Sequence, residues 1–136
     1  MEPESAPFLL IFREESASAV YKAMSPEQRQ QLLQQWNDWC NILTAQGKLQ
    51  QGRPLAPGGW IVSSAAGHVV DGPFVETKEA IGGFFLLTVA GLDEAVEIAK
   101  QCPSLRFGLT IEVRGVAGTC PSLHAQEQVE PLLVNA

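Results

Sequence analysis

Phe84-Phe85-Leu86-Leu87-Thr88-Val89 is the stretch that decides the fold, because five of its six residues are strongly apolar. A strand with apolar side chains at consecutive positions is covered on both faces. Phe8-Leu9-Leu10-Ile11-Phe12, near the N-terminus, has the same character. The two runs therefore predict two central strands of a sheet that has no fully solvated face.

A helical pattern follows each of these strands. Ser25-Pro26-Glu27-Gln28 predicts a helix start, because serine caps helices, proline suits the first helical position, and Gln28 completes a capping box. Behind it, apolar residues recur at helical spacing up to a stop at Gly47: Leu32, Leu33, Trp36, Trp39, Cys40 and Leu43. A shorter helix is predicted after the second strand from Leu92, Ala95, Val96 and Ala99, with Pro103 ending it.

The remaining patterns predict further strands at 49–55, 60–62 and 69–70, and an alternating strand at 109–114. The resulting order is βαβ(β)βαβ, the plan of an α+β, ferredoxin-like sandwich with an antiparallel sheet. Its two helices cover one face of the sheet only. We therefore expect a second subunit's sheet to cover the other face, which makes a homodimer.

The 136 residues suit a single domain. We expect a loose leader at 1–7, the domain at 8–117, and an extension at 118–136 with a short helical turn near 126–133. The balance of 9 basic and 15 acidic residues gives a net charge of −6. An acidic chain repels phosphate backbones, so we expect no nucleic-acid partner.

Other function classes are disfavoured by missing sequence features. There is no apolar run long enough to span a bilayer and no signal-peptide pattern, so we expect a cytoplasmic protein without a membrane partner. Two scattered histidines and three cysteines without CxxC spacing predict no metal site and no disulfide. P-loop and dinucleotide motifs are also missing, so we expect no cofactor.

Asp71-Gly72-Pro73-Phe74 is a strong turn signal that has two interpretations. It is either a rigid turn in which Asp71 accepts backbone hydrogen bonds, or a turn that aims Asp71 into a cavity beside Phe74. An apolar neighbour would raise the pKa of this carboxyl and suit it for proton transfer. Glu76 and Lys78 then form either a solvated loop or the polar rim of a ligand site.

Three further positions have two interpretations each. Arg53 is an exposed arginine or an anion clamp. His68 lies three residues before Asp71 and is either without a role or its acid–base partner. Trp36 and Trp39 belong to the core or to a pocket wall.

The stretch from Asp71 to Glu79, followed by Ile81-Gly82-Gly83-Phe84-Phe85, resembles the signature of the YCII-related family, DGPF branch. The resemblance covers roughly residues 7–116. It implies a dimeric α+β barrel, in which two ferredoxin-like sheets pack face to face. It implies no settled activity. Proteins that share the barrel include small enzymes acting on ring lactones, chlorinated aromatics and polyketides. The family's proposed site uses an Asp, and genes near alternative sigma factors suggest regulation.

Two functions are consistent with these observations, and they leave open whether the chain is an enzyme. The first is a homodimeric, small-molecule-binding domain in a regulatory role. Its pocket would lie near Asp71 and use Gly72, Pro73, Phe74, Glu76, Lys78 and Arg53. The second is a cofactor-free lyase or isomerase with Asp71 as general base.

Overall fold

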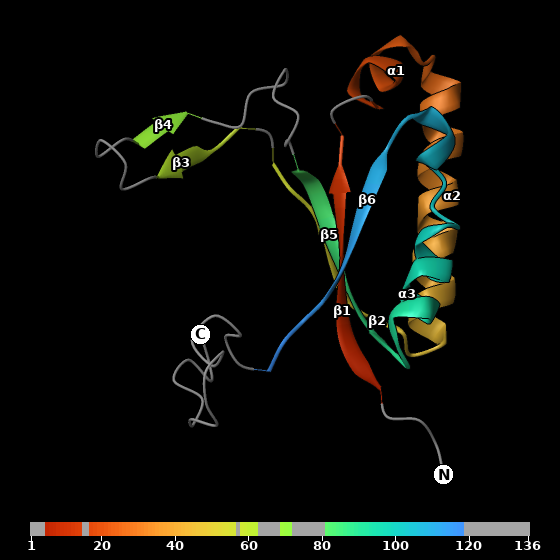
Figure 1. The fold of residues 1–136 in the computed structure, drawn as a ribbon. Coiled ribbons are helices and arrows are strands. Elements are labelled where there is room, and N and C mark those ends of the chain that lie inside the picture. The colour runs from red at the N-terminus through yellow and green to blue at the C-terminus, as the bar shows by residue number, and fades with distance from the viewer. Residues whose placement is uncertain (1–4, 15–16, 57, 63–68, 72–80, 119–136) are drawn as a thin grey trace.

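In a computed structural model, the chain folds as a four-stranded antiparallel sheet with helices on one face (Figure 1). The structure describes residues 5–14, 17–56, 58–62, 69–71 and 81–118. The elements follow in the order β1 (Ala6–Arg13), α1 (Ala17–Ala23), α2 (Pro26–Ala45), β2 (Leu49–Pro54), β3 (Trp60–Val62), β4 (Val69–Asp71), β5 (Ile81–Val89), α3 (Leu92–Ala99), a 3-10 turn (Leu105–Phe107) and β6 (Thr110–Gly115). The predicted helical turn near 126–133 lies outside the described residues.

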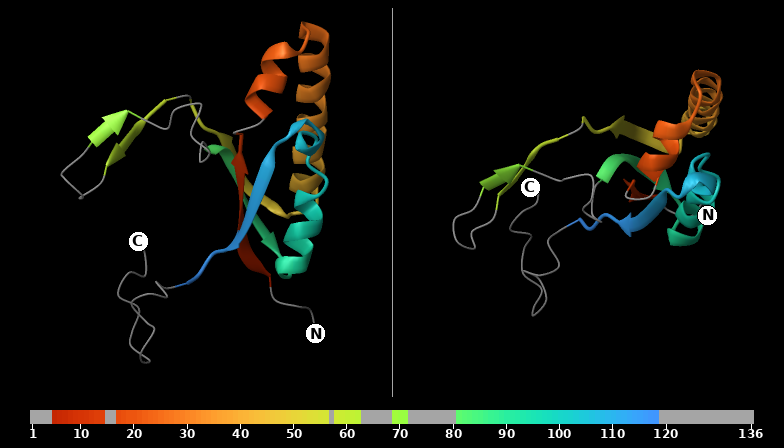
Figure 2. Two further views of the ribbon diagram at one scale, coloured as in Figure 1. Left: turned by 45° about the horizontal axis from the view of Figure 1, so that its top comes forward. Right: turned by 90° about the horizontal axis from the view of Figure 1, so that it is seen from above.

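The sheet has the strand order β2-β5-β1-β6, and every neighbouring pair is antiparallel. The two strands of the apolar runs, β1 and β5, are therefore the two central ones. This confirms the predicted α+β fold with ferredoxin-like topology. Among the described strands, β3 and β4 pair with each other and not with the four-stranded sheet, and their hairpin projects away from the helices (Figures 1 and 2).

The core lies between the sheet and the helices α2 and α3. Alternate residues of β1 and β5 point into it, because side chains along a strand alternate between its faces. The buried cluster consists of Leu10, Phe12, Trp39, Leu43, Phe85, Leu87, Val89, Ala95, Ile98, Ala99, Cys102 and Leu109. Among the described residues, Cys40 and Cys102 are free thiols.

We call the opposite face of the sheet, which no helix covers in Figure 1, the open face. Its centre is also apolar. Leu9 lies opposite Leu86 and Ile11 opposite Phe84 across β1 and β5, and all four are partly exposed. An ion pair borders this centre on the β6 side, where the Arg13 guanidinium lies 2.8 Å from the Glu112 carboxylate. The strands are thus apolar on both faces, as the sequence predicts.

The helices agree with their sequence signals except at α1. The backbone N–H of Gln28 donates to the Ser25 hydroxyl, and the backbone N–H of Ser25 donates to the side-chain oxygen of Gln28. The predicted capping box is therefore present. α1 has no counterpart among the predicted elements, because seven residues are too few for apolar periodicity to stand out. None of the helices in the described ranges is both long and apolar enough to cross a membrane.

Candidate functional site

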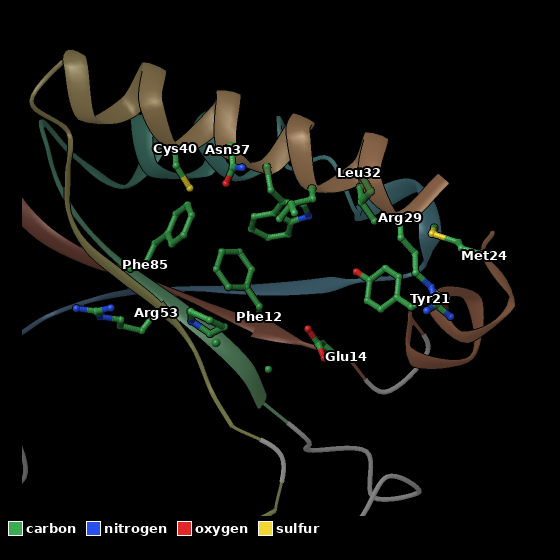
Figure 3. A pocket seen from close by; sticks show the side chains of 16 residues that line it. Phe12, Glu14, Tyr21, Met24, Arg29, Leu32, Asn37, Cys40, Arg53 and Phe85 are labelled. Carbon is green, nitrogen blue, oxygen red and sulfur yellow. Dashed lines mark hydrogen bonds between the residues drawn. The ribbon is translucent and has the colours of Figure 1, made fainter. Parts of the chain in front are cut away.

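A cavity of about 450 Å³ lies between the sheet and the helices α1 and α2. This volume is in the range of small-molecule sites. Figure 3 shows the side chains that line it. The lining residues are Phe12, Glu14, Tyr21, Met24, Arg29, Leu32, Leu33, Trp36, Asn37, Cys40, Gly52, Arg53, Pro54, Gly82, Gly83 and Phe85.

Aromatic rings form the inner wall of the cavity. The Phe12 ring packs edge-on against Trp36 and Phe85, with centroids 5.3 Å and 5.0 Å apart. The Trp36 indole nitrogen donates a 2.8 Å hydrogen bond to the fully buried Ser104 hydroxyl, which also hydrogen-bonds the Tyr21 hydroxyl. Two of the wall's rings are therefore held in place by one buried serine.

Two glycines leave room for the cavity's other groups. A Cβ at residue 52 would lie 2.6 Å from the Phe85 ring, closer than real Cβ contacts. A Cβ at residue 82 would overlap the Glu14 carboxylate. Gly82, near the start of the apolar strand, thus provides the space that Glu14 occupies.

Glu14 is the acidic group of the cavity. It follows Leu10 and Phe12 at alternate positions, so it lies on the helix-facing side of the chain beyond β1. In Figure 3 its carboxylate points into the space between the sheet and α2. Burial raises the pKa of Glu14. Within the described residues it takes part in no ion pair.

The neighbouring Tyr21 is a neutral wall residue. Burial is the main cause that raises its pKa; the Ser104 hydrogen bond lowers the pKa, and repulsion by Glu14, and by Cys102 when it is ionised, raises it. A phenol whose pKa is raised above its ordinary value of about 10 stays protonated at neutral pH.

Neither of the two arginines that line the cavity forms an ion pair with Glu14 within the described residues. Arg29 donates to the carbonyl oxygens of Tyr21, at 3.3 Å, and Lys22, at 3.2 Å, and so ties the end of α1 to α2. Arg53 lies on β2 and is exposed, and Figure 3 shows its side chain leading away from the other labelled residues.

The predicted site residues have different outcomes. Arg53 lines the cavity. The backbone of Asp71 ends β4, where it pairs with Trp60. The side chain of Asp71 lies outside the described residues, as do Gly72, Pro73, Phe74, Glu76, Lys78 and His68. Trp39 is buried in the core, whereas Trp36 lines the cavity, so each predicted interpretation holds for one tryptophan.

Sequence reasoning missed Glu14 and Tyr21. Strand alternation from Leu10 and Phe12 was the signal that could have placed Glu14 on the inner face. Tyr21 lies in the unpredicted α1, so no signal pointed to it. Among the described residues, no three His, Cys, Asp or Glu side chains gather where they could hold a metal ion.

Comparison with known proteins identifies a family. Residues 7–116 match the YCII-related domain. A stretch of 33 residues is 54% identical to an uncharacterized protein of Rhizobium meliloti (strain 1021). That match spans 24% of this chain and 27% of the relative. It therefore gives no information about the activity of this chain. The domain match covers most of the chain, and the resemblance noted in the sequence is confirmed: the chain belongs to the YCII-related domain family.

Proposed function

We propose that this protein is a homodimeric, small-molecule-binding domain in a regulatory role, and that its ligand enters the cavity between the sheet and α2. The observation that carries the proposal is the cavity itself, which combines about 450 Å³ with aromatic walls and one acidic group. Ligand sites are typically apolar hollows with a few placed polar groups. The Asp71-Gly72-Pro73-Phe74 stretch further supports assignment to the DGPF branch.

The homodimer is supported by two surfaces that the described residues of one chain leave uncovered. The first is the apolar centre of the open face. The second is the β3–β4 hairpin, where Trp60 is 68% and Val62 is 75% exposed. An isolated two-stranded hairpin is marginally stable in water, so a partner that covers it would stabilise it. Both surfaces lie on the side away from the helices, which suits face-to-face packing of two sheets (Figure 2).

The catalytic alternative is a cofactor-free lyase or isomerase with Asp71 as general base. The side chain of Asp71 lies outside the described residues, whereas the cavity is formed by residues that the structure describes. We therefore put binding ahead of catalysis.

Binding of N-phenyl-1-naphthylamine, an uncharged dye that fluoresces in apolar surroundings, tests the cavity. We expect the dye to bind the wild-type protein. Asn37→Trp should weaken binding by about tenfold or more, because Asn37 is an exposed lining residue and an indole there would fill the mouth of the cavity. Gln30→Trp is the matched control, since Gln30 is exposed on the same helix and is not a lining residue. Equal affinity of both variants, or no binding to the wild type, would refute the proposed site.

A further inference from the structure

The Glu14 carboxylate points to the chemical class of the ligand. It is partly buried in a mostly apolar cavity, where an ionised carboxylate without a partner is less well solvated than in water. Such a group is stabilised either by taking up a proton or by pairing with a cation.

The described residues do not supply that cation. Arg29 is tied to the carbonyl oxygens at the end of α1. Arg53 leads away from the other labelled side chains (Figure 3). Arg13, the neighbour of Glu14 in sequence, is paired with Glu112 on the open face of the sheet.

The walls around Glu14 are suited to a positive charge. Phe12, Tyr21, Trp36 and Phe85 all line the same cavity. Aromatic rings attract cations through the negative potential of their faces, and the attraction grows when the cation is desolvated. An anionic ligand would meet the carboxylate and these rings unfavourably. The net charge of −6 also attracts cations rather than anions to the protein.

We propose that the ligand carries an ammonium group on an apolar or aromatic body, and that the Glu14 carboxylate binds the ammonium. This inference rests on the proposed function, because it takes the cavity to be the ligand site. The ammonium donates a charge-assisted hydrogen bond to the carboxylate, and the apolar body packs against Phe12, Trp36 and Phe85.

Two molecules of one shape test the inference. 1-Naphthylmethylamine carries the ammonium, and 1-naphthalenemethanol replaces it by a hydroxyl group. Each is measured by its ability to displace N-phenyl-1-naphthylamine at about pH 8, where the amine is still largely protonated. In the wild-type protein we expect the amine to bind about tenfold more tightly than the alcohol, the size of one charge-assisted bond.

Variants test whether Glu14 causes the difference in affinity between the amine and the alcohol. Glu14→Gln keeps the side-chain size and removes the charge, so the amine and the alcohol should then bind within about twofold of each other. Glu14→Asp moves the carboxylate back by one methylene and should leave an intermediate preference. Glu97→Gln, at an exposed glutamate on α3, should keep the full preference. Dye binding by each variant reports whether its cavity is intact.

The preference should also depend on pH. Burial raises the pKa of Glu14, so the carboxylate takes up a proton at a higher pH than an ordinary glutamate does, and the amine preference should shrink as the pH is lowered. The other titratable and charged groups that line the cavity are Tyr21 from α1, Arg29 and Cys40 from α2, and Arg53 from β2. Burial raises the pKa of Tyr21 and of Cys40, so both stay neutral over this pH range.

The outcomes separate this inference from the proposed function. If the dye binds but the amine and the alcohol compete equally in the wild-type protein, the cavity is a ligand site and the ammonium inference is wrong. The same conclusion follows if Glu14→Gln retains the amine preference. If the dye does not bind, both proposals fail.

Discussion

Glu14 shows how much one residue's role depends on its neighbours. In the sequence it belongs to a charged run, Arg13-Glu14-Glu15, that marks the end of an apolar strand. Strand alternation sends Arg13 to the open face and Glu14 to the inner face. The alternation could be predicted from the sequence. The space for the carboxylate could not, because it depends on Gly82 lying beside Glu14 across a distance of 68 residues in the chain.

The stability of the protein should reflect the raised pKa of Glu14. A native-state pKa above the ordinary value of about 4.5 means that the folded protein holds this proton more tightly than the unfolded chain does. Ionising Glu14 therefore lowers the free energy of unfolding as the pH rises from that ordinary value through the native-state pKa. We expect Glu14→Gln, which cannot ionise, to gain stability relative to the wild type as the pH rises from about 4.5 through the native-state pKa of Glu14.

Urea unfolding of both proteins across this range measures the difference. Lys48 lowers the pKa of Glu94, and Arg114 that of Glu112, so both glutamates lose stabilising interactions at low pH. This effect is common to both proteins and cancels in the comparison. For the control Glu97→Gln, we expect only a small difference from the wild type in the free energy of unfolding, and this difference should not grow in the same way as the pH rises. A Glu14→Gln protein that loses stability relative to the wild type as the pH rises would contradict the burial of this carboxylate.

At the scale of elements, local signals predicted α2 well and α1 not at all. The start of α2 is encoded in four adjacent residues, Ser25 to Gln28, whose hydrogen bonds are all local. α1 depends instead on contacts from elsewhere in the chain: Arg29 binds its last carbonyl oxygens, and Ser104 hydrogen-bonds Tyr21. A short helix held by such contacts leaves little trace in its own sequence.

The capping box gives a test of this local encoding. Ser25→Ala removes the oxygen that accepts from the Gln28 amide at 3.1 Å. We expect the free energy of unfolding to fall by about 0.5–2 kcal/mol, the usual effect of losing such a cap. Gln28→Glu is the control, because glutamate also completes the box and its charge suits a helix N-terminus. Chemical denaturation measures both variants; an unchanged midpoint for Ser25→Ala would show that the box contributes nothing to stability.

For the whole molecule, the sequence predicted the topology because hydrophobic pattern and element order restrict an α+β chain to few arrangements. It predicted the cavity less well. Phe12, Trp36, Gly52 and Phe85 come from separate elements, and their meeting depends on how the helix crosses the sheet. Of the residues predicted to bind the ligand, Arg53 lines this cavity, and a ligand-binding role stays a prediction for all of them.

The open face leads to the last prediction, which concerns assembly. Leu9, Ile11, Phe84 and Leu86 present apolar side chains that nothing in the described protomer fully covers. We expect a stable dimer that buries more than about 2,000 Å² in total, as obligate interfaces do. In sedimentation at micromolar concentration, the wild-type protein should have twice the chain mass of 14.7 kDa.

Leu86→Lys places a charge at the middle of this face, opposite Leu9 on one side and Gln51 on the other. Burying that ammonium against a second sheet is unfavourable, so the variant should sediment as a single chain. Ile42→Lys is the matched control, since Ile42 is 56% exposed on α2 and lies away from the sheet's open face. That variant should remain a dimer. A dimeric Leu86→Lys protein, or a wild-type protein with the mass of one chain, would show that the open face is not where two copies meet. In that case something other than the partner's sheet would have to cover the β3–β4 hairpin, because the proposed dimer also covers Trp60 and Val62.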